Sequence, residues 1–357
     1  MVFPADCKFA VLAVHNARVD IAPDLVLANG TRVLTSLPFP LDNHWRTWLG
    51  AMQSQNLQAC NLFLVSIATS GWSDGQLAIF GGEVDTQLMA DVGGIFAFLR
   101  FVGSVEYTDA FVLAGHVENG DPTCRHFATT LRFNISRGCL PWVIREVDLR
   151  CAAQLQESYA TLLKKFPEKW RFGRGCNALK SAFECHYASE RLHGFVRAIE
   201  ALLIPEIGRT EKQFISRCSL FAGPKSKEAE IRAALQEIYR MRCDIEHMHE
   251  WDRSLDAYSA SDRENVAHWR TRQMEELASA AYRKIVSDTA LQPHFYNDAA
   301  TERFWKKPAD EVRTAFGEIC DISKLKTVTK YDYYGRAHPS EWPPDLFENL
   351  RGMAKSA

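Results

Sequence analysis

The sequence lacks any long run of apolar residues. Its longer apolar stretches, at residues 95–98 and 111–114, are far below the about 20 residues that a helix needs to cross a bilayer. The first 20 residues also lack a basic segment followed by an apolar core, which a secretory signal peptide requires. We therefore expect no membrane partner and a cytoplasmic location.

The sequence has no large excess of positive or negative charge, and its cysteines show no framework spacing. Its 42 Lys and Arg residues and 44 Asp and Glu residues leave a formal net charge of −2. A role with nucleic acid would therefore need a local basic patch. The 10 cysteines are scattered, with no Cys-x-x-Cys pair, which predicts reduced thiols rather than a disulfide scaffold.

The length and composition are those of a globular protein. A chain of 357 residues, 46% hydrophobic and 24% charged, suggests two or three domains. We expect an α+β multidomain fold with three parts. Residues 1–143 form a β-rich sensing or regulatory domain, residues 144–290 form an all-helical bundle, and residues 291–357 form a helical, aromatic-rich extension.

The first part is typical of an antiparallel sheet or small barrel with one or two helices. Apolar runs predict strands at 8–15, 60–69 and 76–81, and a helix at 86–102. Asn29-Gly30 predicts a hairpin with a type I′ turn inside residues 25–37, because this pair accepts positive φ angles. A second hairpin is expected from strands at 111–117 and 126–135.

The second part has a helical period from residue 147 onward. It predicts a first helix to about residue 166, a long helix at 172–204 and a short one at 211–221. Ser226 is the expected N-cap of the next helix, and Ser261 or Asp262 that of a final helix to about residue 287. Several helices with short connections make a bundle.

Three segments in this bundle together resemble the Apea-like branch of the HEPN domains. Residues 170–174 read WRFGR, residues 191–203 read RLHGFVRAIEALL, and residues 238–247 read IYRMRCDIEH. Their order and spacing are similar to the family pattern, in which the third segment carries an arginine followed by a histidine. The resemblance spans under half of the chain and says nothing of the first 143 residues.

The resemblance implies an RNA-cleaving toxin or anti-phage defence effector that acts as a homodimer through the bundle. Arg242 and His247 are the implied catalytic pair, shared between two copies. Cleavage without a metal requires a base near the 2′-hydroxyl, a cation on the phosphate and an acid for the leaving oxygen, which histidine and arginine can supply. The implied product is a 2′,3′-cyclic phosphate, and no cofactor or metal is expected.

The register on this helix leaves alternatives open. Residues five apart on a helix diverge by about 140°, whereas residues seven apart share a face. Arg240 with His247, and Arg242 with His249, are seven apart. Arg242 is also four residues from Glu246, which predicts an intrahelical ion pair. The candidate helpers of the catalytic pair are Tyr239, Arg240, Glu246 and His249.

Departures from the family pattern favour a second hypothesis. Cys243 stands where the family has a small polar residue, Met248 stands where it often has glycine, and acidic residues crowd the site. The alternative is a catalytically silent dimerisation scaffold whose N-terminal domain binds a ligand or partner.

One basic run could bind RNA phosphates, with aromatic residues between the cations for base stacking. The alternative is a solvated loop with buried aromatics. The run consists of Lys164, Lys165, Lys169, Arg171 and Arg174, with Phe166 and Trp170.

Two other sequence patterns are weak evidence for a function. Residues 247–250 read HMHE and lack the His-Glu-x-x-His order of a zinc protease, so no metal site is predicted. Residues 71–75 read GWSDG, which matches a hydrolase elbow around Ser73. Such an elbow joins a strand to a helix, and a strand is expected at 76–81, so a turn is the better interpretation.

Overall fold

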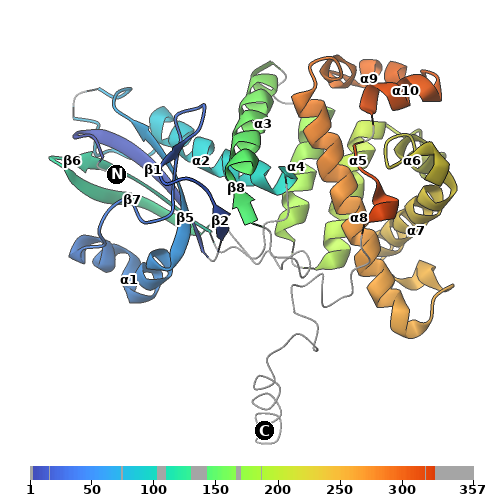
Figure 1. Cartoon of the computed structure of the whole chain (residues 1–357), viewed down its shortest axis with the longest axis horizontal. Coiled ribbons are helices and arrows are strands. Elements are labelled where there is room, and N and C mark those ends of the chain that lie inside the picture. Colours follow the sequence, from blue (N-terminus) through green and yellow to red (C-terminus); the bar gives the residue numbers. More distant parts are fainter. Residues whose placement is uncertain are drawn as a thin grey trace, which may run out of the picture.

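A computed structural model describes residues 3–15, 17–73, 75–102, 110–129, 143–165, 170–185, 187–317 and 319–325. The chain begins with a sheet and continues with helices, and helices α2 and α3 lie between the two (Figure 1). The expected α+β architecture, with an antiparallel sheet first and helices after it, is confirmed.

The sheet has six strands in the order β3-β4-β5-β1-β6-β7. Each neighbouring pair is antiparallel. The strands are β1 (Cys7–His15), β3 (Leu25–Val26), β4 (Arg32–Leu34), β5 (Cys60–Ala68), β6 (Ala110–Glu118) and β7 (Asp121–Thr129). The central strand β1 is almost wholly buried, in agreement with its unbroken apolar run. A separate parallel pair joins β2 (Arg18–Asp20) to β8 (Val143–Arg145).

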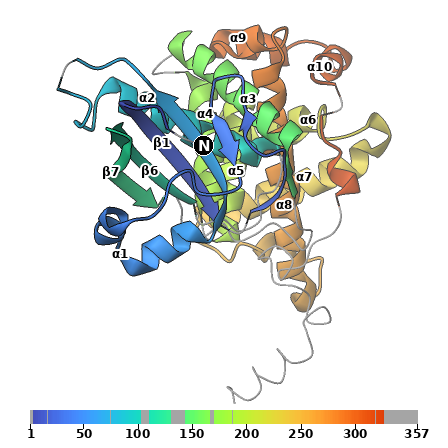
Figure 2. The same ribbon diagram turned by 60° about the vertical axis from the view of Figure 1, so that its left-hand side comes forward.

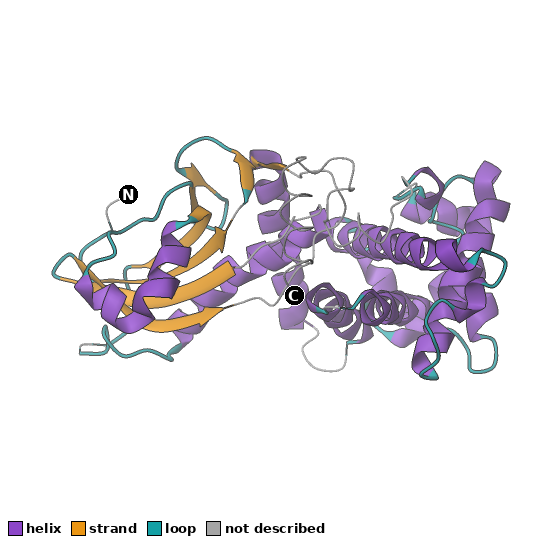
Figure 3. Cartoon of the chain, turned by 90° about the horizontal axis from the view of Figure 1, so that it is seen from below, coloured by secondary structure: helices purple, strands orange, loops and turns teal. Residues whose placement is uncertain are grey.

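Helices cover both faces of this sheet. Successive side chains of a strand point to opposite faces. Phe9 and Val11 of β1 share one apolar cluster with Trp45 of α1 (Asn43–Gln58). Leu12 belongs to the other cluster, with Val92 of α2 (Glu83–Val102). Figure 3 shows the sheet edge-on, with helices beside it.

The sequence did not predict α1, and the strand expected at 76–81 is wrong. Residues 69–73 and 75–82 form a loop between β5 and α2. The buried ammonium of Lys8 donates to the carbonyl of Ile79 at 2.7 Å and pairs with Asp85 at 2.9 Å. The loop is thus attached to the sheet by a side chain rather than by strand pairing.

The hairpin around Asn29-Gly30 is confirmed, but its turn is not type I′. Strands β3 and β4 pair antiparallel across residues 27–31. Gly30 has a φ of +83°, whereas Asn29 is not among the residues with positive φ. A type I′ turn needs positive φ at both central residues, so this loop is a longer one.

The helices after β8 form the expected bundle. They are α3 (Glu146–Lys165), α4 (Arg171–Glu184), α5 (Ala188–Leu203), α6 (Thr210–Cys218), α7 (Glu228–Glu246), α8 (Ala260–Ser287), α9 (Asp298–Trp305) and α10 (Ala309–Phe316). Figure 2 shows α4 to α8 gathered behind the sheet. Short 3₁₀ turns lie at Lys225–Lys227, Arg253–Leu255, Gln292–Phe295 and Ile322–Lys324.

Three helix predictions are wrong in detail. α8 begins at Ala260, so neither Ser261 nor Asp262 is its N-cap. The single helix expected at 172–204 is two helices, because the chain turns at Cys185, whose backbone is extended. α4 and α5 then pack closely. A Cβ added at Gly194 would lie only 2.6 Å from that of Ala182. Ser226 is not an N-cap, since it lies inside a 3₁₀ turn and α7 begins at Glu228.

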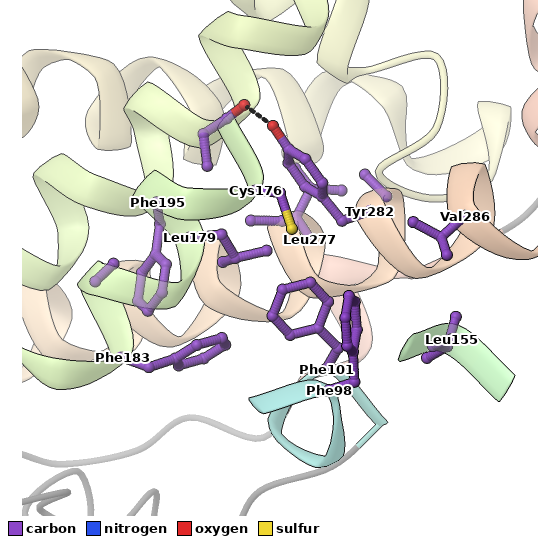
Figure 4. Packing of buried hydrophobic residues seen from close by; sticks show 14 of the residues in the cluster. Phe98, Phe101, Leu155, Cys176, Leu179, Phe183, Phe195, Leu277, Tyr282 and Val286 are labelled. Carbon is purple, nitrogen blue, oxygen red and sulfur yellow. Dashed lines mark hydrogen bonds between the residues drawn. The ribbon is translucent and has the colours of Figure 1, made fainter. Parts of the chain in front are cut away.

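One hydrophobic core runs from the sheet into the bundle. Phe98 and Phe101 of α2 lie against Tyr159 of α3 and Phe183 of α4, with ring centroids 5.3 and 5.9 Å apart respectively. Figure 4 shows these α2 rings beside residues of α4 and α8, together with the 2.8 Å hydrogen bond from the Tyr282 hydroxyl to a bundle carbonyl. The expected boundary at 143/144 falls within β8, just before the helices of the bundle, and the core extends across it.

Part of the C-terminal extension packs on the bundle. The indole of Trp305 donates to the carbonyl of Leu202 at 2.8 Å, and Phe304 and Phe316 are buried. Residues 326–357 lie outside the described residues. Across the described part of the chain, no helix is both long and apolar enough to cross a membrane, and the described cysteines are free thiols.

Candidate active site and arginine cleft

Arg242 lies on α7 and faces α5. Its side chain is 15% exposed, and its Nη2 lies 3.3 Å from Oε2 of Glu200 on α5. Its Nη1 donates to the carboxylate of Glu246, one turn further along α7. The intrahelical pair with Glu246 is therefore as predicted, whereas Glu200 was not identified from the sequence.

Glu200 belongs to a polar face of α5 that the sequence analysis missed. His193, Arg197 and Glu200 follow a spacing of four and three residues, which places them on one side of a helix. The ring nitrogen Nε2 of His193, Oε1 of Glu200 and Nε of Arg242 are buried without a hydrogen-bond partner among the described residues. This spacing is the signal that could have found them.

Burial sets the protonation of this face. It raises the pKa of the Glu200 carboxyl, an effect that the Arg242 guanidinium opposes. Burial also lowers the pKa of His193, and the cations of Arg242 and Arg197 lower it further. His193 is therefore uncharged at neutral pH.

His247 lies apart from this buried group. It is the C-cap of α7, its backbone N–H donates to the carbonyl of Cys243, and its side chain is exposed. Met248, which follows it, has a φ of +59° and leaves the helix path. No hydrogen bond joins the side chains of Arg242 and His247 in the described structure, so these two residues are not paired within one chain.

The candidate helpers have separate surroundings. Arg240 is exposed and lies 3.7 Å from Glu211, and His249 is exposed beyond the end of α7. Tyr239 is buried against Phe214, with ring centroids 5.2 Å apart. Burial and the carboxylate of Glu200 raise the pKa of Tyr239 to about 12, so its hydroxyl keeps its proton at neutral pH.

A cleft of about 420 Å³ brings Arg242 together with part of the basic run. Four guanidinium groups line it, those of Arg171, Arg174, Arg197 and Arg242, with Glu200 as the one carboxylate among its described lining. The remaining lining consists of small or weakly polar residues: Gly175, Ala178, Ala201, Pro205 and Thr210. The cleft is thus a local basic site on a chain of net charge −2.

The four arginines differ in their partners. Arg171 makes a two-pronged pair with Asp298 of α9, at 2.8 and 3.1 Å, and Arg242 is held by its two glutamates. Arg174 and Arg197 are exposed and make no ion pair with another described residue. These two side chains are free to bind an anion, and Arg197 was not predicted from the sequence.

The rest of the predicted basic run does not line the cleft. Lys164 and Lys165 are exposed at the end of α3, and the ammonium of Lys165 lies 4.8 Å from the ring centroid of Tyr296. Lys169 and Phe166 lie outside the described residues. Trp170 is buried and donates to the carbonyl of Phe295 at 2.7 Å, so it is not available to stack on a base.

The structure gives no support to the two weaker sequence patterns, at residues 247–250 and 71–75. Among the described residues, no group of three or more His, Cys, Asp or Glu side chains could hold a metal ion. Ser73 lies in the loop between β5 and α2. Residues 75–82 form no strand, contrary to the prediction. α2 begins only at Glu83, too far along for a strand–elbow–helix unit.

Comparison of the chain with protein-family models, with curated proteins and with solved structures gives no significant match. The resemblance to HEPN domains therefore rests on the three segments of this sequence.

Proposed function

We propose that the chain is a metal-independent HEPN-type endoribonuclease that acts as a homodimer. The observation that supports this most is the cleft in which Arg242 meets Arg171, Arg174 and Arg197. Guanidinium groups bind phosphate oxygens in a fixed planar geometry. A groove with four of them and one carboxylate suits a phosphodiester backbone.

In the proposed reaction the 2′-hydroxyl of RNA attacks the adjacent phosphorus and the bond to the 5′-oxygen breaks. A histidine takes the proton from the 2′-hydroxyl, and a second acid protonates the leaving 5′-oxygen. The arginines stabilise the charge that gathers on the non-bridging oxygens. The products are a 2′,3′-cyclic phosphate and a 5′-hydroxyl.

The position of His247 explains why we propose a dimer. His247 is exposed at the end of α7 and has no side-chain contact with Arg242 of its own chain. In the proposal, His247 of one copy acts at the arginine cleft of the other copy. The composite site therefore forms only when two bundles dimerise.

The pairing of Arg242 favours the second candidate, a silent dimerisation scaffold. Two carboxylates, from Glu200 and Glu246, already satisfy this guanidinium. RNA phosphate would have to compete with them, at a cost in binding free energy.

The deciding experiment is an RNA cleavage assay with a chelator present. Wild-type protein, an Arg242→Ala/His247→Ala variant and an Arg240→Ala/His249→Ala variant are incubated with tRNA and unstructured RNA. The proposal expects cyclic phosphate ends from the wild type and none from the first variant. The second variant tests the helix register, because a pair of Arg240 with His247, or of Arg242 with His249, would lose activity in both variants.

Intact RNA with folded, dimeric wild-type protein would reject the nuclease and leave the scaffold. Activity lost in both variants would move the site to one of the pairs seven residues apart, which the four single alanine variants would then distinguish.

A further inference from the structure

A second cavity lies on the seam between α3 and α8, away from the arginine cleft. Its volume is about 470 Å³, within the roughly 300–1,000 Å³ of small-molecule sites. One wall comes from α3, including Leu155 and Ser158, and another from α8, including Arg283 and Lys284. Phe316, at the end of α10, closes a third side.

The cavity contains the guanidinium of Arg283, which forms no ion pair among the described residues. The guanidinium of Arg283 donates through Nη1 to the carbonyls of Phe101 and Val102, at 2.7 and 3.3 Å. No carboxylate of the described residues forms an ion pair with it. Lys284 beside it is neutralised by Asp288 at 2.8 Å. These carbonyls lie at the C-terminal end of α2, where the helix dipole favours a cation, and they satisfy only part of the guanidinium's donors and charge. The remaining donors of this half-buried guanidinium retain capacity for an anion.

The opposite side of the cavity is apolar. Cys151 and Ile319 are half-buried, pack against the hydrophobic core and line the cavity. Gln154 and Ser158 add hydrogen-bonding groups at the α3 side. A few placed polar groups on an apolar wall are typical of sites for organic ligands.

We propose that this cavity binds a small organic anion, with one phosphate, sulfonate or carboxylate group on a ring or short apolar chain. Arg283 binds the anionic group, and Cys151 and Ile319 contact the apolar body. Since Arg283 also caps the carbonyl end of α2, the bound anion fixes the junction between the sheet and the bundle. The cavity thus provides a ligand site within the bundle, linked to the end of α2 through Arg283, independent of the nuclease proposal.

The test uses two probes that differ by one charged group. 8-Anilinonaphthalene-1-sulfonate carries an anionic group on an aromatic body, and N-phenyl-1-naphthylamine has the same rings without it. Fluorescence titration of the folded full chain is expected to give one tight site for the sulfonate. Loss of the charge-assisted hydrogen bond should weaken the uncharged probe by about 10- to 100-fold.

Two variants locate the site. Gln154→Trp fills the mouth from an exposed position of α3 and leaves Arg283 in place, so the fold should survive and the sulfonate should bind at least about tenfold more weakly. Arg283→Gln tests the charge directly. Arg150→Gln, on the same helix as Gln154 but paired with Glu146 and outside both cavities, is the matched control and should leave the titration unchanged.

Competition completes the experiment. Adenosine monophosphate and benzoate offer a phosphate and a carboxylate, and displacement of the probe by either supports the proposal and identifies the preferred head group. The proposal fails if the wild type does not bind the sulfonate, or if Gln154→Trp or Arg283→Gln binds it as tightly as the Arg150→Gln control does.

Discussion

Removing the two unpaired arginines of the cleft should change how RNA binding depends on salt. Arg174→Gln/Arg197→Gln takes away two exposed guanidinium groups that have no carboxylate partner among the described residues. Each cation that neutralises a phosphate releases a counterion, which contributes about 0.7 to the slope of log affinity against log salt for a single strand. The double variant should therefore lower the slope by about 1.4.

This slope gives a measurable ratio. Between about 50 and 200 mM salt the affinity advantage of the wild type over the variant should shrink about sevenfold. Fluorescence anisotropy of a labelled single-stranded RNA measures it. Both side chains are exposed, so the free energy of unfolding should change by no more than about 0.5 kcal/mol.

A matched control removes the same charge elsewhere. Arg32→Gln/Arg150→Gln lies outside the cleft, and each of its arginines already pairs with a carboxylate. Its slope should equal that of the wild type within error. Equal slopes for the cleft variant and the wild type would refute the assignment of RNA phosphates to this cleft.

Three further predictions concern stability, measured by urea unfolding. Phe98→Ala should destabilise the chain by about 3–5 kcal/mol, because it leaves a cavity between α2 and the bundle; a loss below about 1 kcal/mol would contradict the shared core. Lys8→Met should cost about 3–5 kcal/mol by leaving Asp85 buried and unpaired, and adding Asp85→Asn should recover part of that loss, whereas full additivity would argue against the pair. The pKa of His193 is lowered in the folded chain. When the pH falls below the unfolded-state pKa of about 6.5, the unfolded state therefore binds a proton more readily than the folded state does. The wild type should then lose more stability than His193→Gln, and parallel losses would show that His193 is not the group involved.

Local sequence patterns predicted the elements that are buried uniformly along their length, on one side or on both. The strand at β1 is apolar along its whole length because both faces of the sheet are covered, and the helical period of α7 follows from one buried side. α1 was missed because it is mostly polar and bends at Gly50, where φ is +77°. The break between α4 and α5 was missed because no proline or glycine marks Cys185.

The candidate site was predictable only within single segments. Arg242, Arg171 and Arg174 come from motifs that can be read along the chain. Glu200 is 42 residues from Arg242 in sequence, and their contact depends on how α5 and α7 cross, which no local pattern gives. The spacing from His193 to Glu200 hinted at a polar helix face but not at its partner.

The position of α2 has a consequence for how the chain unfolds. Its Phe98 and Phe101 rings are core for the bundle, while Val92 is core for the sheet. A bundle expressed from residue 144 would lack this helix and expose Tyr159 and Phe183 to water. We therefore expect the sheet and the bundle to unfold in a single cooperative transition. A ligand that binds to either part would then protect the whole chain from denaturation and from proteases, since only the folded state binds it.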